Sequence, residues 1–176
     1  MVADATAHGQ CIGMALLKDE WEEAYQGNLP IFDIGCVGRL ISVNTFQDGR
    51  SNILLEGLQR CHLEEQFLET SYRQAKISLK PCDASPQSIE SSIRSSLIQV
   101  ADTYLRTQKA HDICQLIATQ TFTDETLVNN LSAGLNFTTL EKQFLLESEH
   151  LSQQARRLID LIQFKLLECT ADNEAE

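Results

Sequence analysis

Several features of catalytic and metal-binding proteins are missing from this sequence of 176 residues. It has no Gly-x-x-x-x-Gly-Lys-Ser/Thr segment, the Walker-type loop that binds the phosphates of ATP. Its six cysteines form no Cys-x-x-Cys pair, its four histidines lie far apart, and no His-Glu-x-x-His segment occurs. Because none of these spacings indicates a zinc or redox site, we predict no metal and no cofactor.

Basic residues are scarce: 14 Lys and Arg stand against 25 Asp and Glu, for a net charge of −11. An acidic surface repels phosphate backbones, so we expect no nucleic-acid partner. No apolar run approaches the ~18 residues that a membrane helix needs. The start, Met1 to Ala5, lacks the basic and apolar regions of a secretory signal. The expectation is a cytoplasmic protein, not bound to a membrane, whose cysteines are reduced.

The residues before Pro81 favour strands. Residues 36–46 alternate, which predicts a strand with Val37, Ile41 and Val43 on one face and Leu40 on the other. Asp48-Gly49 follows, and this dipeptide between apolar runs indicates a hairpin, since glycine accepts the positive φ of tight turns. Further strands are predicted over residues 52–56, 59–65 and 75–79, with Gly57 as a break between the first two.

Beyond Pro81 the hydrophobic period changes to that of helices. Helices are predicted from Ser85-Pro86 to about Leu105, over residues 107–121, from Asp124 to near Gly134, from the Thr138–Glu141 capping box, and over Glu149–Glu168, with a frayed tail after Thr170. The predicted fold class is therefore α+β. A small antiparallel β-unit over residues 1–80 would precede a C-terminal helical bundle over residues 81–176.

Four linked elements stand in order in the β-unit: a Gly-x-x-Gly strand, an Asp-Gly-Arg turn, a Gly-x-x-Arg element and a Tyr-x-x-Ala strand. Their principal residues are Gly35, Cys36, Gly38, Arg39, Asp48, Gly49, Arg50, Gly57, Arg60, Tyr72 and Ala75. The pattern resembles the N-terminal, substrate-binding domain family of Lon proteases. The helix start at residues 141–147 is similar to the family as well. The resemblance implies a PUA-like pseudo-barrel in which these motif residues are structural.

In that family the domain helps to engage unfolded or tagged proteins for an attached motor and peptidase. The resemblance therefore implies a non-catalytic module whose partners are unfolded or extended protein segments, or another protein. Exposed strand edges and apolar grooves are the surfaces that can hold such a segment. For Arg39 and Arg60 two roles remain open. They could bind an anion, or, as we favour, they could bond carbonyls and carboxylates at the strand ends.

Two other functions remain as alternatives. Ser132-Ala133-Gly134 echoes the nucleophile segment of Lon's proteolytic domain. A serine nucleophile needs a nearby base, however, and the nearest lysine in sequence, Lys142, lies beyond a helix break. We therefore predict no catalytic residue, and keep a cryptic serine peptidase as the less favoured hypothesis. The second alternative is a structural adaptor that acts through the Glu149–Glu168 helix.

The beginning of the chain supports one more expectation. Members of the family open with strands that precede a helix, and here residues 1–4 resemble the inside of that helix. We expect the chain to lack those opening strands. The exposed edge left behind would then favour pairing with a second copy, that is, a homodimer.

Overall fold

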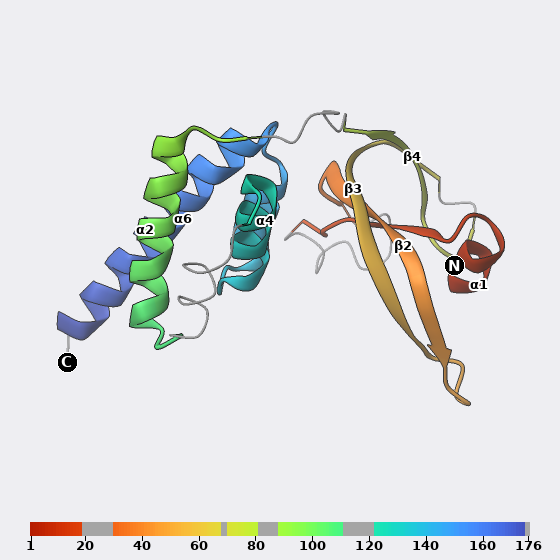
Figure 1. The fold of residues 1–176 in the computed structure, drawn as a ribbon. Coiled ribbons are helices and arrows are strands. Elements are labelled where there is room, and N and C mark those ends of the chain that lie inside the picture. The colour runs from red at the N-terminus through yellow and green to blue at the C-terminus, as the bar shows by residue number, and fades with distance from the viewer. Residues whose placement is uncertain (19–29, 68–69, 81–87, 111–121, 175–176) are drawn as a thin grey trace. The chain divides into compact units, whose positions relative to one another are not determined.

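The computed structural model describes residues 1–18, 30–67, 70–80, 88–110 and 122–174. It divides into two compact units, Met1–Cys82 and Asp83–Glu176. In Figure 1 the first unit, coloured red to olive, carries one short helix and the described strands, whereas the second, green to blue, is helical. The predicted α+β class, with strands before a helical region, is confirmed.

The first unit is built on one antiparallel sheet of four strands in the order β1-β2-β3-β4. A short helix, α1 (Val2–Ala7), precedes the sheet, which agrees with the helix predicted at the start of the chain. The strands are β1 (Cys11–Met14), β2 (Ile34–Thr45), β3 (Ser51–Phe67) and β4 (Gln74–Leu79).

The prediction of two strands around Gly57 is wrong, because residues 51–67 form the single strand β3. Pairing with β2 passes from Gly38–Gly57 to Val37–Gln59, which leaves Leu58 as an extra residue in a β-bulge. A bulge adds a residue to one strand without ending it. Gly57 therefore marks a bulge rather than a break.

The predicted faces of β2 are also wrong. Val37 and Leu40 are both buried, whereas Ile41 and Val43 are exposed. The register shifts between Leu40 and Ser42 leave Ile41 unpaired as a bulge residue. In addition, β1 pairs only with residues 36–39 and β4 only with residues 61–67. The outer part of the β2–β3 hairpin is thus a two-stranded ribbon that projects beyond the other strands (Figure 1).

The second unit contains the helices α2 (Ser91–Thr107), α4 (Asp124–Gly134), α5 (Thr139–Leu146) and α6 (Leu151–Glu174). The helices predicted from Asp124, from the Thr138 capping box and over residues 149–168 are confirmed. The last of these continues to Glu174, past the point where fraying was predicted. The helix predicted over residues 107–121 falls largely outside the described residues, since α2 ends at Thr107 and residues 111–121 are not described.

The start predicted for α2 is wrong. Residues 85–87 lie outside the described residues, but residues 88–90 are not helical and Glu90 is the N-cap. The backbone N–H of Ile89 donates to the Asp124 carboxylate at 2.9 Å, and Arg94 also pairs with Asp124. These contacts tie the approach to α2 to the start of α4 instead of letting it continue the helix.

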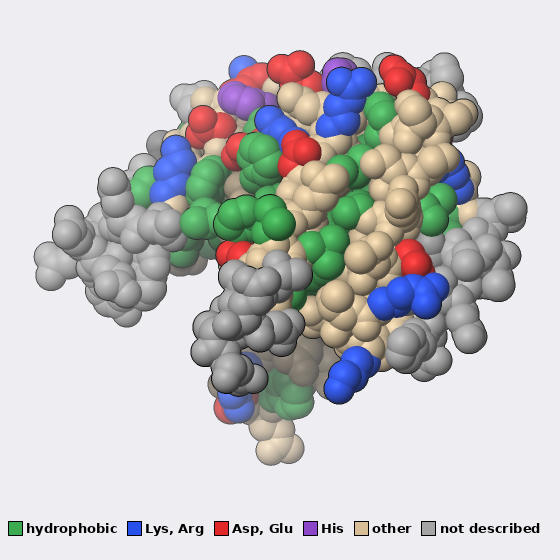
Figure 2. Space-filling model, turned by 90° about the vertical axis from the view of Figure 1, so that its left-hand side faces the viewer, with side chains coloured by type: hydrophobic (Ala, Val, Ile, Leu, Met, Phe, Trp, Pro, Cys, Tyr) green, Lys and Arg blue, Asp and Glu red, His purple; other side chains and the backbone are tan. Residues whose placement is uncertain are grey.

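One apolar cluster forms the core of the second unit. Leu97 and Tyr104 of α2 and Leu158 and Ile162 of α6 are buried in it. No helix of the described residues is long and apolar enough to cross a membrane. On the face of the molecule drawn in Figure 2, acidic and basic side chains are interspersed, with apolar side chains between them.

Candidate functional site

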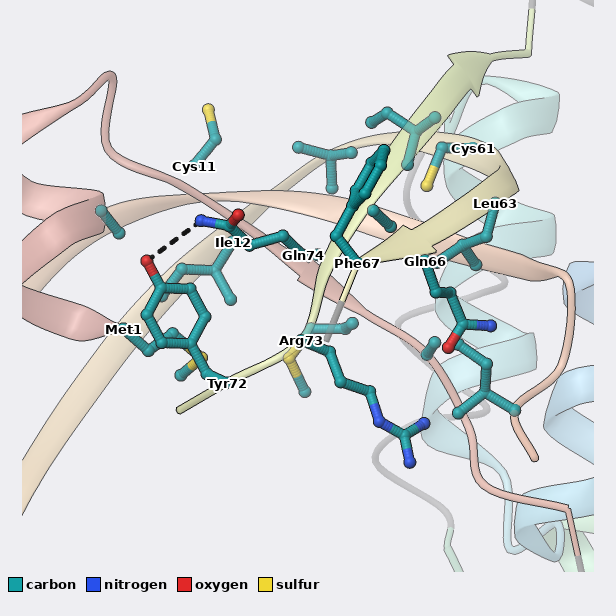
Figure 3. Close-up of a pocket in the computed structure, with 18 of the residues that line it drawn as sticks. Met1, Cys11, Ile12, Cys61, Leu63, Gln66, Phe67, Tyr72, Arg73 and Gln74 are labelled. Atoms are coloured by element: carbon teal, nitrogen blue, oxygen red, sulfur yellow. Dashed lines mark hydrogen bonds between the residues drawn. The ribbon is translucent and has the colours of Figure 1, made fainter. Parts of the chain in front are cut away.

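An open groove of about 1070 Å³ lies in the first unit, lined by residues of α1 and of all four strands (Figure 3). Ile12, Val37 and Cys61 are the buried part of its lining. Since the sheet has β1 and β4 as its edges and both line the groove, the sheet curls around it, as a pseudo-barrel does. The groove matches the upper end of the range of small-molecule pockets, about 300–1000 Å³.

Several exposed residues of the lining are apolar too. Met14 is 58% exposed, Leu17 and Phe67 are 40% exposed, and Ile77 is 37% exposed. Exposed apolar side chains that line a groove are suited to contact with another molecule. The groove thus has an apolar interior, and exposed apolar side chains lie on its rim beside polar ones such as Gln66 and Gln74.

Polar groups gather where α1 meets the start of β4. Gln74 donates a hydrogen bond to the Tyr72 hydroxyl at 3.3 Å, as Figure 3 shows. A hydrogen bond from Tyr72, followed by the nearby chain amino group, lowers the pKa of Asp4 below its usual range. The Nδ1 atom of His8 lies 3.0 Å from the Asp4 backbone carbonyl oxygen. These polar side chains are largely occupied with one another, and the larger part of the groove is left to apolar contacts.

The Gly-x-x-Gly element sets how closely the strands approach beside the groove. A Cβ on Gly35 would lie 2.5 Å from the Met14 carbonyl oxygen, a distance that no side chain tolerates. A Cβ on Gly38 would lie 3.3 Å from the Cβ of Leu55. Glycine at position 35 therefore lets β1 lie close against β2, which brings Met14 to the groove.

The Asp-Gly-Arg element forms the hairpin turn, as predicted. Gly49 has φ +85°, and its N–H donates to the Phe46 carbonyl at 3.1 Å. The Arg50 Nε donates to the Asp48 carboxylate at 2.8 Å, and this contact lowers the pKa of Asp48. These three motif residues shape a turn and do not line the groove.

The remaining motif residues divide between the sheet and the groove. Arg39 lies 3.9 Å from the Glu56 carboxylate, with both side chains more than half exposed. The Arg60 carbonyl accepts a hydrogen bond from the Lys80 N–H at 3.0 Å. Of the eleven motif residues, Tyr72 and Ala75 line the groove. Sequence reasoning missed most of the lining, although the alternation of β4 pointed to an apolar face there.

The serine segment sits within helix α4. The Ser132 hydroxyl donates to the Val128 carbonyl at 2.7 Å and accepts from the Gln154 side chain at 3.3 Å. Lys142 comes close despite the helix break, but its ammonium donates to the Ala133 carbonyl at 3.1 Å. The serine proton is thus held by a backbone carbonyl. The described residues also hold no group of three His, Cys, Asp or Glu side chains suited to a metal ion.

Solved structures with the same fold are N-terminal domains of Lon proteins. The N-terminal domain of the Mycobacterium avium complex Lon protease matches with a TM-score of 0.58 and 15% identity, over 88% of this chain and 90% of that one. A Lon N-terminal domain protein from Xanthomonas campestris matches with a TM-score of 0.66 and 14% identity, over 90% and 80% of the two chains. At these identities the likeness concerns the fold.

The family follows from the sequence. The model of the ATP-dependent protease La (LON) substrate-binding domain matches residues 1–163, and the chain belongs to this family. The predicted resemblance is confirmed. The Lon protease of Cytophaga hutchinsonii is 25% identical over an alignment of 136 residues that covers 75% of this chain and 17% of that protein. The Lon protease of Flavobacterium johnsoniae is 25% identical over 185 residues, covering the whole chain and 22% of its own length. The chain thus spans about a fifth of these relatives.

Proposed function

We propose that this chain is a protein-binding module without catalytic activity, which holds unfolded or extended protein segments in the groove of its first unit. The observation that carries the proposal is the open groove of about 1070 Å³ with an apolar interior and exposed apolar side chains on its rim. Unfolded chains expose the apolar side chains that folded proteins bury, so such a groove binds an unfolded client in preference to a folded one. The family description as a substrate-binding domain supports it.

The composition of the rim suits clients of varied sequence. Met1 and Met14 both line the groove and are 51% and 58% exposed. Methionine has an unbranched, polarizable side chain that adapts to differently shaped partners, and such side chains recur on promiscuous binding surfaces. We expect binding that depends on apolar content more than on sequence, in a cytoplasmic setting where an ATP-dependent protease could receive the client.

The adaptor hypothesis also has an observation in its favour. On α6, Phe164 is 55% exposed and Leu167 is 68% exposed. These positions are three residues apart, so they lie on one face of the helix. A partner could bind this face, but it offers these two exposed large apolar side chains, whereas the groove lining has five: Met1, Met14, Leu17, Phe67 and Ile77. We therefore keep the adaptor as the second candidate.

Substitution of two phenylalanines distinguishes binding in the groove from the adaptor hypothesis. Phe67, 40% exposed, lines the groove, and Phe164, 55% exposed, lies on α6. Binding of fluorescently labelled unfolded casein is measured by anisotropy for the wild type, Phe67→Ser and Phe164→Ser. We expect Phe67→Ser to weaken binding at least about fivefold, since aromatic anchors dominate interfaces, and Phe164→Ser to bind as the wild type does. Absence of casein binding by the wild type, or loss through Phe164→Ser alone, would contradict the proposal.

The same mixtures test for catalysis. We expect neither casein cleavage nor ATP hydrolysis, because the sequence lacks a phosphate loop and the Ser132 proton is held by the Val128 carbonyl. Casein fragments are sought by electrophoresis after prolonged incubation. Cleavage that disappears in Ser132→Ala would establish the peptidase instead.

A further inference from the structure

The outer edge of β4 combines three properties that no other described segment of the first unit shares. It is an edge of the four-stranded sheet, at the opposite end from β1. All six of its residues are exposed. It borders the groove through Ala75 and Ile77. A strand edge beside an apolar groove has both main-chain groups and side-chain pockets for an added strand.

The direction of the main-chain groups of β4 follows from its pairing. The Lys80 N–H donates to the Arg60 carbonyl of β3 at 3.0 Å, and the register pairs Leu79 with Cys61 and Ile77 with Leu63. In an antiparallel ladder, successive residues turn their N–H and C=O groups alternately towards the partner and away from it. Since Lys80 faces β3, the groups of Leu79, Ile77 and Ala75 face the outer edge.

The side chains of β4 alternate in chemistry as well. Ala75, Ile77 and Leu79 lie on one face of the strand, and two of these line the groove. Successive side chains point to opposite faces, so Lys76 and Lys80 lie on the other. Ile77 is 37% exposed and Leu79 is 55% exposed, so an added strand would cover apolar surface that is now open.

The charge of this strand is opposite to that of the chain. Residues 70–80 carry Arg73, Lys76 and Lys80 and no acidic residue, although the whole chain has a net charge of −11. Lys76 lies 3.5 Å from Glu64 across the ladder, with side chains 67% and 40% exposed. An ion pair this exposed is weak, and it leaves room for a second carboxylate beside the ammonium group.

We propose that the outer edge of β4 takes up an extended client segment as an added strand, and that it prefers segments in which apolar residues alternate with acidic ones. The apolar side chains would lie beside Ile77 and Leu79 over the groove, and the acidic ones beside Lys76 and Lys80. This inference rests on the proposed function and names the class of segment and the strand that bind. Lysines also protect edge strands against pairing, and the experiment separates that role from this one.

The probe is a capped, fluorescent peptide of about eight residues that alternates valine and glutamate, long enough to cover a typical strand. Its comparators are a valine–lysine peptide and a peptide with the same valines and glutamates in two blocks. Two further versions of the probe carry N-methyl groups on alternate amides, one version on the even and one on the odd positions. In an added strand only every second N–H faces the protein. We expect the alternating acidic probe to bind tightest, and only one methylated version to lose binding.

Protein variants locate the edge. Ile77→Pro removes an N–H that faces outward, which edge strands tolerate, whereas Ile77→Ala keeps that N–H and shortens the side chain. We expect Ile77→Pro to weaken binding of the probe at least about tenfold and Ile77→Ala to weaken it about threefold, since each 1.4 kcal/mol is tenfold in affinity. Lys76→Glu should weaken it about fivefold, and the control Lys109→Glu, an exposed lysine of the second unit with the same charge change, should not. Circular dichroism verifies that each variant is folded, and the methylated probes test the pairing on the wild type alone.

Each result bears on the proposal. Equal effects of the two methylation patterns, or equal binding by Ile77→Pro and Ile77→Ala, would overturn strand addition at β4. Tighter binding of the valine–lysine peptide would show that the lysines do not select acidic segments, and no binding of any probe would show that the edge takes up no strand. Either result would overturn the proposal too. If casein still binds and still depends on Phe67, only this inference fails. If casein binding itself is absent, the proposed function fails.

Discussion

Among the described residues, sixteen buried apolar side chains form one cluster in the second unit, whereas four are buried in the first unit: Ile12, Val37, Leu40 and Cys61. The first unit leaves apolar side chains such as Met14, Phe67 and Ile77 more than a third exposed around its groove. Burial of apolar surface is the main source of folding free energy. Among the described residues, the second unit uses its apolar residues for its own stability, and the first leaves many of them for contact.

The difference follows from the elements. Each helix of the second unit presents a stripe of apolar residues, and stripes on α2, α4 and α6 meet in one core. In the first unit a ribbon of residues 42–45 and 51–54 pairs only with itself, and β4 has no buried residue. A two-stranded ribbon cannot bury a face without a covering layer. The exposed apolar strands of the first unit therefore follow from its topology and are not a packing defect.

The largest expected effect tests whether the two units differ in packing. Leu158→Ala removes a side chain with 0% exposure from α6, and Leu79→Ala removes one that is 55% exposed on β4. Deleting a fully buried leucine costs about 3–5 kcal/mol of unfolding free energy through lost burial and a cavity. An exposed one should cost less than about 1 kcal/mol. Urea unfolding followed by circular dichroism measures both. Equal losses would show that the first unit is packed as tightly as the second.

A smaller expected effect tests where the strands of the first unit are tightly packed. Gly35→Ala would place a Cβ 2.5 Å from the Met14 carbonyl oxygen, whereas Gly13→Ala, in the adjacent strand, meets no atom within 4 Å. Forcing atoms into a packed site costs about 1–3 kcal/mol, and we expect that loss for Gly35→Ala alone. Thermal unfolding of the two variants checks it. A comparable loss in Gly13→Ala would show that strand propensity, and not the approach of β1 to β2, decides.

The helices could be predicted well because their signals are local. The Thr138–Glu141 capping box has both of its hydrogen bonds, at 3.2 and 2.7 Å. The stripe from Leu151 to Ile162 needs only the helical period to be recognised. The start of α2 was missed because it depends on a hydrogen bond from Ile89 to Asp124, which lies 35 residues further along the chain.

The strands and the groove could be predicted only in part. A glycine such as Gly57 is equally compatible with a break and with a bulge, and only the register with β2 separates the two. The hairpin turn at Asp48-Gly49 was predictable because its signal is again local. The groove draws its lining from segments between Met1 and Ile77, and their proximity depends on strand pairing. The motif residues indicated the family, but nine of the eleven lie outside the groove lining.

The smallest expected effect is electrostatic, and it tests whether the second unit is the more tightly fixed of the two. Glu141 accepts from the Thr138 N–H at 2.7 Å, and its other carboxylate oxygen lies 3.2 Å from the Lys165 ammonium of α6. Burial raises the pKa of Glu141, but the hydrogen bonds from Thr138 and Lys165 outweigh it, and the pKa is lowered overall. In the first unit, Asp48 has its pKa lowered by Arg50 within a single turn.

Glutamine can replace glutamate in a capping box, so Glu141→Gln removes chiefly the link between α5 and α6. We expect a loss of about 0.5 kcal/mol at neutral pH. Because the pKa of Glu141 is lower in the folded state, its contribution is full above its unfolded pKa and is lost as the pH falls through the folded pKa. The difference between wild type and variant should therefore shrink at acid pH and vanish once the pH lies below the folded-state pKa. Urea unfolding at neutral and at acid pH measures it.

Asp48→Asn is the matched variant in the first unit, and we expect a smaller change there because the Asp48–Arg50 pair joins no two elements. A gap for Glu141→Gln that persists in acid would mean that side-chain shape, and not charge, joins α5 to α6.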